Sequence, residues 1–149
     1  MAWQVAQAGA ADREDWFALR EALWPQPVEM QSQEISEILE RADCAAFLAR
    51  NVAGRAVGFA EASLRRDFVS GCETSPVGFL EGIYVTPYVR RQGVARALVD
   101  AVTAWTRTQG CSELASDAAI DNLASHQMHE ALGFSETERV VFFRRVLKE

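Results

Sequence analysis

Residues 83–99 read IYVTPYVRRQGVARALV, in which an apolar, strand-like run enters a short basic turn and then the start of a helix. Arg90 and Arg91 lie in the turn, and Gly93 and Ala95 leave no bulk over the backbone where the helix begins. The N-terminus of a helix has unpaired N–H groups and the positive end of the helix dipole, and both attract anions. The stretch therefore predicts a cradle for a pyrophosphate.

The glycine spacing narrows the kind of pyrophosphate. The stretch has neither the Gly-x4-Gly-Lys-Ser/Thr of a Walker loop nor the Gly-x-Gly-x-x-Gly of a dinucleotide fingerprint. Arg90-x-x-Gly93-x-Ala95 instead resembles the (Gln/Arg)-x-x-Gly-x-(Gly/Ala) signature of the GNAT superfamily of acetyl-CoA-dependent N-acetyltransferases. A later segment, 122–134, ends in a Gly-Phe pair at the distance that this family uses.

Length and composition indicate a single folded domain, residues 1–149. A chain of 149 residues buries roughly two-thirds of its unfolded surface, which is enough for an ordinary core. Its apolar content of 49% is that of a globular protein, and no apolar run approaches the ~20 residues of a membrane span. We therefore expect no membrane partner.

Charge and cysteine content narrow the partners and the compartment. The formal net charge of −6 argues against a nucleic acid, because phosphate contacts need clustered Lys and Arg, and it suits a cationic small molecule. The three cysteines, Cys44, Cys72 and Cys111, are odd in number and have no C-x-x-C spacing. The N-terminus lacks the basic start and long apolar block of a secretory signal. We expect a cytoplasmic protein.

The pattern along the chain predicts strands and helices in the order β-α-α-β-β-β-α-β-α-β, which resembles the order of the α/β, mixed-sheet (α+β) GNAT fold. The expected strands are 2–8, 44–50, 56–64, 77–85, 111–118 and 140–147, and the expected helices run from the cap Asp12 to Trp24 and over 30–42, 94–109 and 122–132. Helix 30–42 is expected to turn Glu34, Glu37 and Glu40 to solvent. The polar, aperiodic stretch 65–76 is expected to be a binding loop, because so long a connection is often functional.

Several further blocks resemble the aminoglycoside 6′-N-acetyltransferases. They read LREALWP at 19–25, GFAEASLR at 58–65, GCETSPV at 71–77, FLEGIYV at 79–85 and ELASD at 113–117, and the match continues from 122 to 145. The resemblance implies the GNAT acyl-CoA N-acyltransferase fold, acetyl-CoA as co-substrate, an aminoglycoside antibiotic as acceptor, and a homodimer. No metal is implied.

The resemblance also implies roles for individual residues. Ile83, Tyr84 and Val85 would present backbone to the pantetheine arm and thioester, Arg91, Gln92, Gly93, Val94, Ala95 and Arg96 would hold the pyrophosphate, and Asn122 would contact the coenzyme. Trp24, Phe68, Glu81, Asp117 and Glu138 would face the antibiotic. Phe68 departs from the family, because relatives commonly carry a loop tyrosine there and its phenol hydrogen bond is lost.

Acetyl transfer to an amine needs a base, because the amine is largely protonated at neutral pH and cannot attack a thioester in that form. Asp117 and Glu81 are the candidates, and each can instead simply hold the cation through charge-assisted hydrogen bonds. A strand bulge would free a backbone N–H for the developing oxyanion, most plausibly at Val85. His129 stands where the superfamily often has a tyrosine acid, so the general acid is left open.

Other interpretations stay open beside this one. A GNAT enzyme that acetylates a polyamine, another metabolite amine or a protein N-terminus would share the cradle but not the acidic surface of Glu73, Glu81, Asp117 and Glu138. A non-catalytic coenzyme-binding or drug-sequestering protein would release no thiol. His126 and His129, at i and i+3, favour a packing role over a metal site, because no carboxylate or cysteine completes a ligand set beside them.

Overall fold

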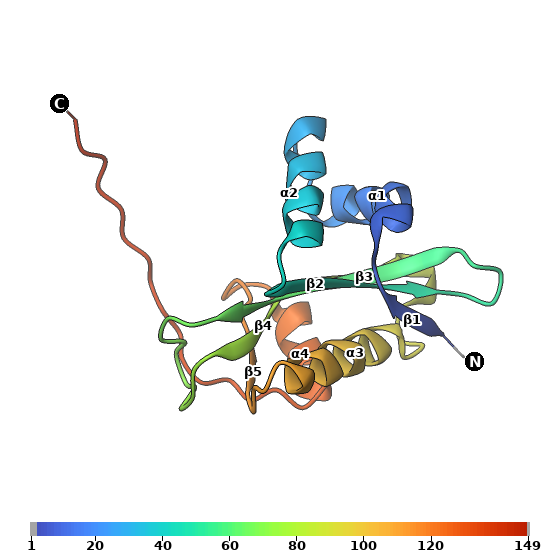
Figure 1. Ribbon diagram of the computed structural model, residues 1–149. Helices are drawn as coiled ribbons and strands as arrows, with labels where there is room; N and C mark the ends of the chain where they lie inside the picture. Colours follow the sequence, from blue (N-terminus) through green and yellow to red (C-terminus); the bar gives the residue numbers. More distant parts are fainter. Residues whose placement is uncertain (1–2, 149) are drawn as a thin grey trace. The chain divides into compact units, whose positions relative to one another are not determined.

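The computed structural model describes residues 3–148, which form two compact units that divide between Asp117 and Ala118. The first unit holds a five-stranded mixed sheet in the order β1-β2-β3-β4-β5 (Figure 1). Its strands are β1 (Gln4–Gln7), β2 (Cys44–Arg50), β3 (Ala56–Arg65), β4 (Val77–Val85) and β5 (Leu114–Ser116). The first four pair antiparallel, and β5 runs parallel to β4. The predicted mixed sheet is therefore confirmed.

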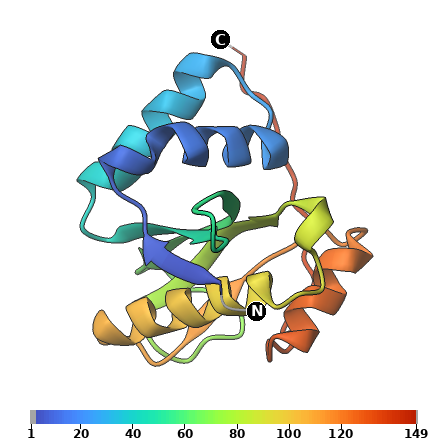
Figure 2. The same ribbon diagram turned by 90° about the vertical axis from the view of Figure 1, so that its right-hand side faces the viewer.

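Helices cover both faces of this sheet. α1 (Arg13–Leu23) and α2 (Val28–Glu40) lie on one face, and α3 (Val94–Thr108) lies on the other (Figures 1 and 2). The face under α1 and α2 buries Trp16, Ile35 and Phe59 to 1% exposure or less. On the opposite face, Leu98 and Val102 of α3 are fully buried. Two apolar layers thus hold the sheet between them and fix the position of β4, which carries Glu81, Ile83, Tyr84 and Val85 of the predicted site.

The hairpin between β2 and β3 forms as its sequence predicts. The Asn51 side chain closes the turn, because its Oδ1 accepts the N–H groups of Ala53 and Arg55, each at 3.0 Å. Gly54 supplies the positive φ of 84° that this turn requires.

Some predicted boundaries were wrong by a few residues. Helix 30–42 begins at Val28, directly after Pro27, and ends at Glu40. The strand expected at 111–118 is observed only over Leu114–Ser116, the three residues that pair with Gly78, Phe79 and Leu80 of β4. Strand 2–8 is observed as Gln4–Gln7, and its first residue lies outside the described part of the chain.

The second unit contains α4 (Leu123–Ala131) and a long extended tail. The predicted last strand, 140–147, was wrong: this segment has no regular secondary structure, and no described strand pairs with it. Its apolar side chains are exposed, with Phe142 at 90% and Phe143 at 92%. Alternating apolar and aromatic residues make a strand possible, but a strand forms only where a neighbour accepts its backbone hydrogen bonds.

Within residues 3–148, no helix has both the length and the apolar character needed to cross a bilayer. The longest, α3, has 15 residues and carries charged side chains.

Candidate functional site

The strand β4 carries a bulge at Glu81. On β3, Glu61 pairs with Gly82 and the next residue, Ala62, pairs with Leu80, so Glu81 is the extra residue of β4. A bulge bends the strand and turns its extra side chain in a new direction. A bulge was expected beside Val85, but the bulge lies four residues earlier, at Glu81.

Val85 presents its backbone on the side of β4 that faces away from β3. Thr86 N–H donates to the carbonyl of Val57 at 2.9 Å, so this pair is a hydrogen-bonded one. Hydrogen-bonded and non-hydrogen-bonded pairs alternate along an antiparallel ladder, which makes the next pair, Gly58 with Val85, non-hydrogen-bonded. The same alternation turns the backbone of Ile83 away from β3.

No strand of the first unit covers this edge of β4. Among the described residues, β5 pairs with β4 at Gly78, Phe79 and Leu80 and then ends. The Val85 carbonyl accepts a hydrogen bond from Arg90 Nε at 2.8 Å. The Val85 N–H is left directed at the space beside the strand, where it can bind a ligand oxygen. The expected oxyanion donor is thus supported by the open edge of β4 and not by a bulge beside it.

The basic turn after β4 forms a concave run of backbone N–H groups. Arg91 and Gly93 have positive φ values, 64° and 89°, and Gly93 is the N-cap of α3. The first helical bond runs from Ala97 N–H to the Gly93 carbonyl at 3.0 Å, so the amides of Val94 and Ala95 have no acceptor within the helix. Such a turn at a helix N-terminus is suited to a phosphate group.

Other side chains complete the turn. Arg91, Gln92 and Arg96 are exposed around it. The Gln92 carbonyl accepts the indole N–H of Trp3 at 2.9 Å, which ties the turn to the chain before β1. A β-carbon at Gly93 would meet no atom within 4 Å, so the backbone conformation is what requires glycine there.

Trp24 lies directly over β4. Its ring contacts the α-carbon of Gly82, and it meets Phe59 edge to face with 5.8 Å between the ring centroids. Gly82 follows Glu81, so the half-buried indole is next to the bulge. The structure therefore brings two residues of the predicted substrate surface together.

Glu81 is held by two neighbours from β3. Arg65 donates from Nε to Oε2 at 3.1 Å and from Nη2 to Oε1 at 2.7 Å, and the Ser63 hydroxyl donates to Oε2. The Arg65 guanidinium also lies on the ring of Phe79, with Cζ 3.5 Å from the ring centroid. Both oxygens of Glu81 therefore accept hydrogen bonds from groups of β3.

Asp117 leaves the sheet at the same level as Glu81. Leu80 pairs with Ser116 in the parallel β4–β5 ladder, so Glu81 and Asp117 are the first residues beyond the last pair. Asp117 is exposed, and within residues 3–117 its carboxylate has no hydrogen-bond or ion-pair partner. Of the two predicted carboxylates, Asp117 is the one with oxygens available to take a proton.

A buried polar network beneath Trp24 was missed by sequence reasoning. Arg20 is 3% exposed, Glu61 5% and Gln31 0%. The Arg20 guanidinium pairs with Glu61 and Glu34, and the Trp16 indole donates to Glu61 Oε2 at 2.8 Å. Burial raises the pKa of Glu61, and Arg20 and Trp16 offset part of that rise. The sequence signal that could have revealed this network was the presence of Arg20 and Glu61 among the apolar residues of α1 and β3.

The same network corrects one expectation and supports Trp24. The Glu34 side chain is 40% exposed, but it is not a purely solvated charge, because it supplies a counter-charge to the buried Arg20 guanidinium. Gln31 Nε2 donates to the Trp24 carbonyl at 2.6 Å, and the Arg20 Cζ lies 4.9 Å from the centroid of the Trp24 ring. Both the backbone and the ring of Trp24 are thereby attached to buried groups.

The loop after β3 is anchored near its end. The Glu113 carboxylate accepts the backbone N–H groups of Glu73 at 3.0 Å and Thr74 at 2.7 Å. Its pKa is lowered, chiefly because the Thr74 hydroxyl also donates to it. Phe68, in the first half of the loop, is 86% exposed and is not brought to the other predicted residues.

Two predicted residues belong to the second unit. Asn122 caps α4, since its Oδ1 accepts the N–H of Ser125 at 3.1 Å, and Glu138 is exposed in the extended tail. The His126 and His129 rings hydrogen-bond to the carbonyls of Ala119 and Ser125 at 2.9 and 2.7 Å. Across residues 3–148, no three or more His, Cys, Asp or Glu side chains gather as metal ligands would.

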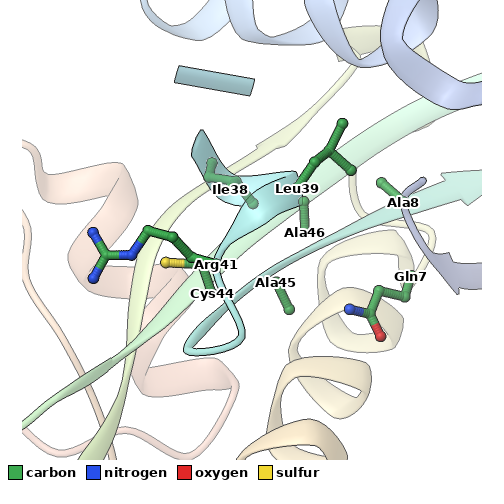
Figure 3. Close-up of a pocket in the computed structure, with 8 residues that line it drawn as sticks. All are labelled: Gln7, Ala8, Ile38, Leu39, Arg41, Cys44, Ala45 and Ala46. Carbon is green, nitrogen blue, oxygen red and sulfur yellow. The ribbon is translucent and has the colours of Figure 1, made fainter. Parts of the chain in front are cut away.

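A small pocket lies apart from these residues. Figure 3 shows eight residues that line it, from β1, the end of α2 and β2 and the residues next to them, Arg41 and Cys44 among them. Burial raises the pKa of the Cys44 thiol. None of the residues predicted for the coenzyme or the acceptor lines this pocket.

Comparison with known proteins agrees with this geometry. The sequence model of the acetyltransferase (GNAT) family matches residues 13–134. Aminoglycoside N(6′)-acetyltransferase type 1 of Serratia marcescens is 55% identical over 133 residues, 89% of this chain and 91% of that protein. The crystal structure of the aminoglycoside 6′-N-acetyltransferase AAC(6′)-Ih from Acinetobacter baumannii superposes with a TM-score of 0.94 at 43% identity, covering 99% of this chain and 100% of that one.

A second solved structure carries a ligand. AAC(6′)-Iy, in complex with the bisubstrate analogue CoA-S-monomethyl-acetylneamine, superposes with a TM-score of 0.94 at 44% identity, covering 99% of this chain and 100% of that one. The resemblance stated from the sequence, in both family and fold, is confirmed.

Proposed function

The chain belongs to the acetyltransferase (GNAT) family, and we propose that it transfers the acetyl group of acetyl-CoA directly to the 6′-amine of aminoglycoside antibiotics. One observation carries this proposal. Glu81 and Asp117 each follow the last pair of the β4–β5 ladder, so the two carboxylates start from neighbouring positions beside the edge of β4 that is open at Val85. An acceptor with several ammonium groups suits two carboxylates next to an aromatic side chain, Trp24.

The coenzyme is proposed to bind along β4 and the turn that follows it. The amides of Gly93, Val94 and Ala95 and the side chains of Arg91 and Arg96 suit a pyrophosphate, since the turn exposes N–H groups at the positive end of α3. The outward-facing backbone of Ile83 and Val85 suits the amide-bearing pantetheine arm. Acetyl-CoA supplies an acetyl thioester: the amine nitrogen forms a bond to its carbonyl carbon, the bond to sulfur then breaks, and the coenzyme leaves as a thiolate that is protonated to the thiol as the nitrogen loses its second proton.

Asp117 is proposed to take the proton from the acceptor ammonium, directly or through one water, and Glu81 is proposed to hold a cationic group. With no acceptor bound, Arg65 and Ser63 donate to the oxygens of Glu81, which supports a cation-holding role for this carboxylate, whereas the Asp117 carboxylate has no hydrogen-bond partner within residues 3–117. The Val85 N–H is proposed to stabilise the oxyanion that forms on the thioester carbonyl. The proposed reaction needs no covalent intermediate with the enzyme.

Further parts of the proposal rest on single features. A single working domain, 1–149, is supported by the family match, which runs through the boundary between the two units. A homodimer is supported by the exposed apolar residues of 140–147, because this segment could pair as a strand with a second copy of the chain. A cytoplasmic setting is supported by the free thiols of Cys44, Cys72 and Cys111. Phe68, Asn122 and Glu138 are proposed as further ligand contacts by resemblance.

Neomycin and paromomycin together test the proposed reaction, because neomycin has a 6′-amine where paromomycin has a 6′-hydroxyl. Both should bind the acidic surface, but neomycin should be acetylated much faster, since a hydroxyl is the poorer nucleophile. Thiol release from acetyl-CoA measures the rate, and mass spectrometry locates the acetyl group. Equal rates, or acetylation on another ring, would contradict the 6′ assignment. A panel including spermidine tests the alternative of a polyamine acceptor.

A further inference from the structure

We propose that Arg65 is a built-in cation that occupies Glu81 in the absence of an acceptor and is displaced by an ammonium group of the acceptor. This inference rests on the proposed function, in which Glu81 holds a cation. The guanidinium donates to both carboxylate oxygens, at 3.1 and 2.7 Å, and so takes the position that a substrate ammonium would need. Binding of the acceptor is then an exchange of one cation for another.

The arrangement allows Arg65 to leave. Arg65 is the last residue of β3, directly before the loop 66–76, and its side chain is 43% exposed. Its second contact, the ring of Phe79, offers no opposite charge that would be left unpaired. Ion pairs between half-exposed side chains contribute little stability, because water screens them and the long side chains lose rotational freedom.

Glu81 stays in place when Arg65 leaves. The bulge of β4 fixes the backbone direction at Glu81, and the Ser63 hydroxyl, one strand away, still donates to Oε2. A carboxylate that remains oriented can accept an ammonium group with little rearrangement. The tethered guanidinium competes for the carboxylate and weakens the binding of any cation that needs Glu81.

The matched pair Arg65→Gln and Arg66→Gln tests this exchange. Each substitution removes one positive charge, but Arg66 pairs with Asp43, at 3.6 Å, and not with Glu81. The probe is neomycin, and its dissociation constant is measured by calorimetry without acetyl-CoA. Arg65→Gln should tighten binding about two- to fivefold relative to Arg66→Gln, the range expected for a half-exposed ion pair. Arg65→Lys, which keeps the charge, should bind like the unsubstituted protein.

A double-mutant cycle separates exchange from a structural effect. In a Glu81→Gln background, Arg65→Gln should no longer tighten neomycin binding, because the guanidinium has no carboxylate to occupy. An equal gain with and without Glu81, or weaker binding in Arg65→Gln alone, would overturn the inference. If the unsubstituted protein acetylates neomycin but Arg65→Gln matches Arg66→Gln, this inference fails alone. If the unsubstituted protein neither binds nor acetylates neomycin, the proposed function fails with it.

Discussion

The indole of Trp24 lies so close to Gly82 that a β-carbon built there would be 2.2 Å from both Cη2 and Cζ2 of the ring. No real β-carbon fits at that distance, so glycine at this position is a condition for the aromatic ring to lie on β4. The contact sets Trp24 beside Glu81, and buried Gln31 and Arg20 hold its other side. The position of Trp24 in the proposed acceptor site therefore depends on a residue with no side chain.

Gly82→Ala should displace Trp24 and weaken acceptor binding. Inserting a methyl group into a filled space costs about 1–3 kcal/mol of stability, and the half-buried ring is the part that can move. We expect a raised KM for neomycin, a smaller change in the KM for acetyl-CoA, and a lower unfolding midpoint in urea. Gly9→Ala is the control, because a β-carbon at Gly9 meets no atom within 4 Å and its φ is negative. Equal effects of both substitutions would contradict the role of the contact.

Gly93→Val should raise the KM for acetyl-CoA strongly while the protein stays folded. Gly93 has a φ of 89°, and an L-residue in a left-handed conformation costs roughly 1–2 kcal/mol, more when it is β-branched. The turn would then relax and misdirect the amides at the start of α3. Gly93→Asn should have a smaller effect, because asparagine tolerates this conformation better than other residues. Unchanged coenzyme affinity in a folded Gly93→Val protein would remove the cradle assignment.

Asp117→Asn should lower kcat more than Glu81→Gln does. An amide keeps the shape of the carboxylate but does not accept the proton, and of these two carboxylates Asp117 is the one without a hydrogen-bond partner within residues 3–117, whereas Glu81 has Arg65 and Ser63. Glu81→Gln should act mainly on the KM for the acceptor, because it removes a cation contact. Steady-state rates across pH for both variants separate the two roles. A larger loss of kcat in Glu81→Gln would reverse the assignment.

Asp12 should make the fold sensitive to acid. The Gly9 N–H donates to its carboxylate at 2.8 Å, and with Arg50, also at 2.8 Å, this lowers the pKa of Asp12 below its usual 3.8. A carboxyl with a lowered pKa in the folded state stabilises the fold above the unfolded pKa, and that contribution is lost as pH falls through the folded pKa.

Asp12→Asn should therefore be less stable than the unsubstituted protein at pH 7, and the difference should shrink as pH falls below about 3.8. Urea unfolding at several pH values measures it. Asp15→Asn is the matched control, since Asp15 pairs with the same Arg50 but its side chain is 52% exposed, and its effect should be smaller. A constant difference between Asp12→Asn and the unsubstituted protein at every pH would contradict the assignment.

Local signals in the sequence were sufficient to predict a segment wherever its backbone conformation and hydrogen bonds depend on residues of the same short segment. The hairpin turn closes on the Asn51 side chain, and the basic turn ends at a glycine with the positive φ that begins α3. Each depends on residues at most a few positions apart, so spacing alone predicts it. The family resemblance came from the same kind of contiguous blocks, and the mixed sheet followed from it.

Features that need a distant partner were decided by the tertiary structure. Residues 140–147 have the composition of a strand but no described neighbour to pair with, and Glu34 looked solvated until buried Arg20 supplied the opposite charge. The occupation of Glu81 by Arg65 likewise depends on the β3–β4 register and its bulge. The sequence by itself thus determined the family, the cradle and the identity of the candidate carboxylates. Tertiary structure decided which carboxylate is engaged and which is available, because hydrogen bonds and burial depend on neighbours that folding brings from elsewhere in the chain.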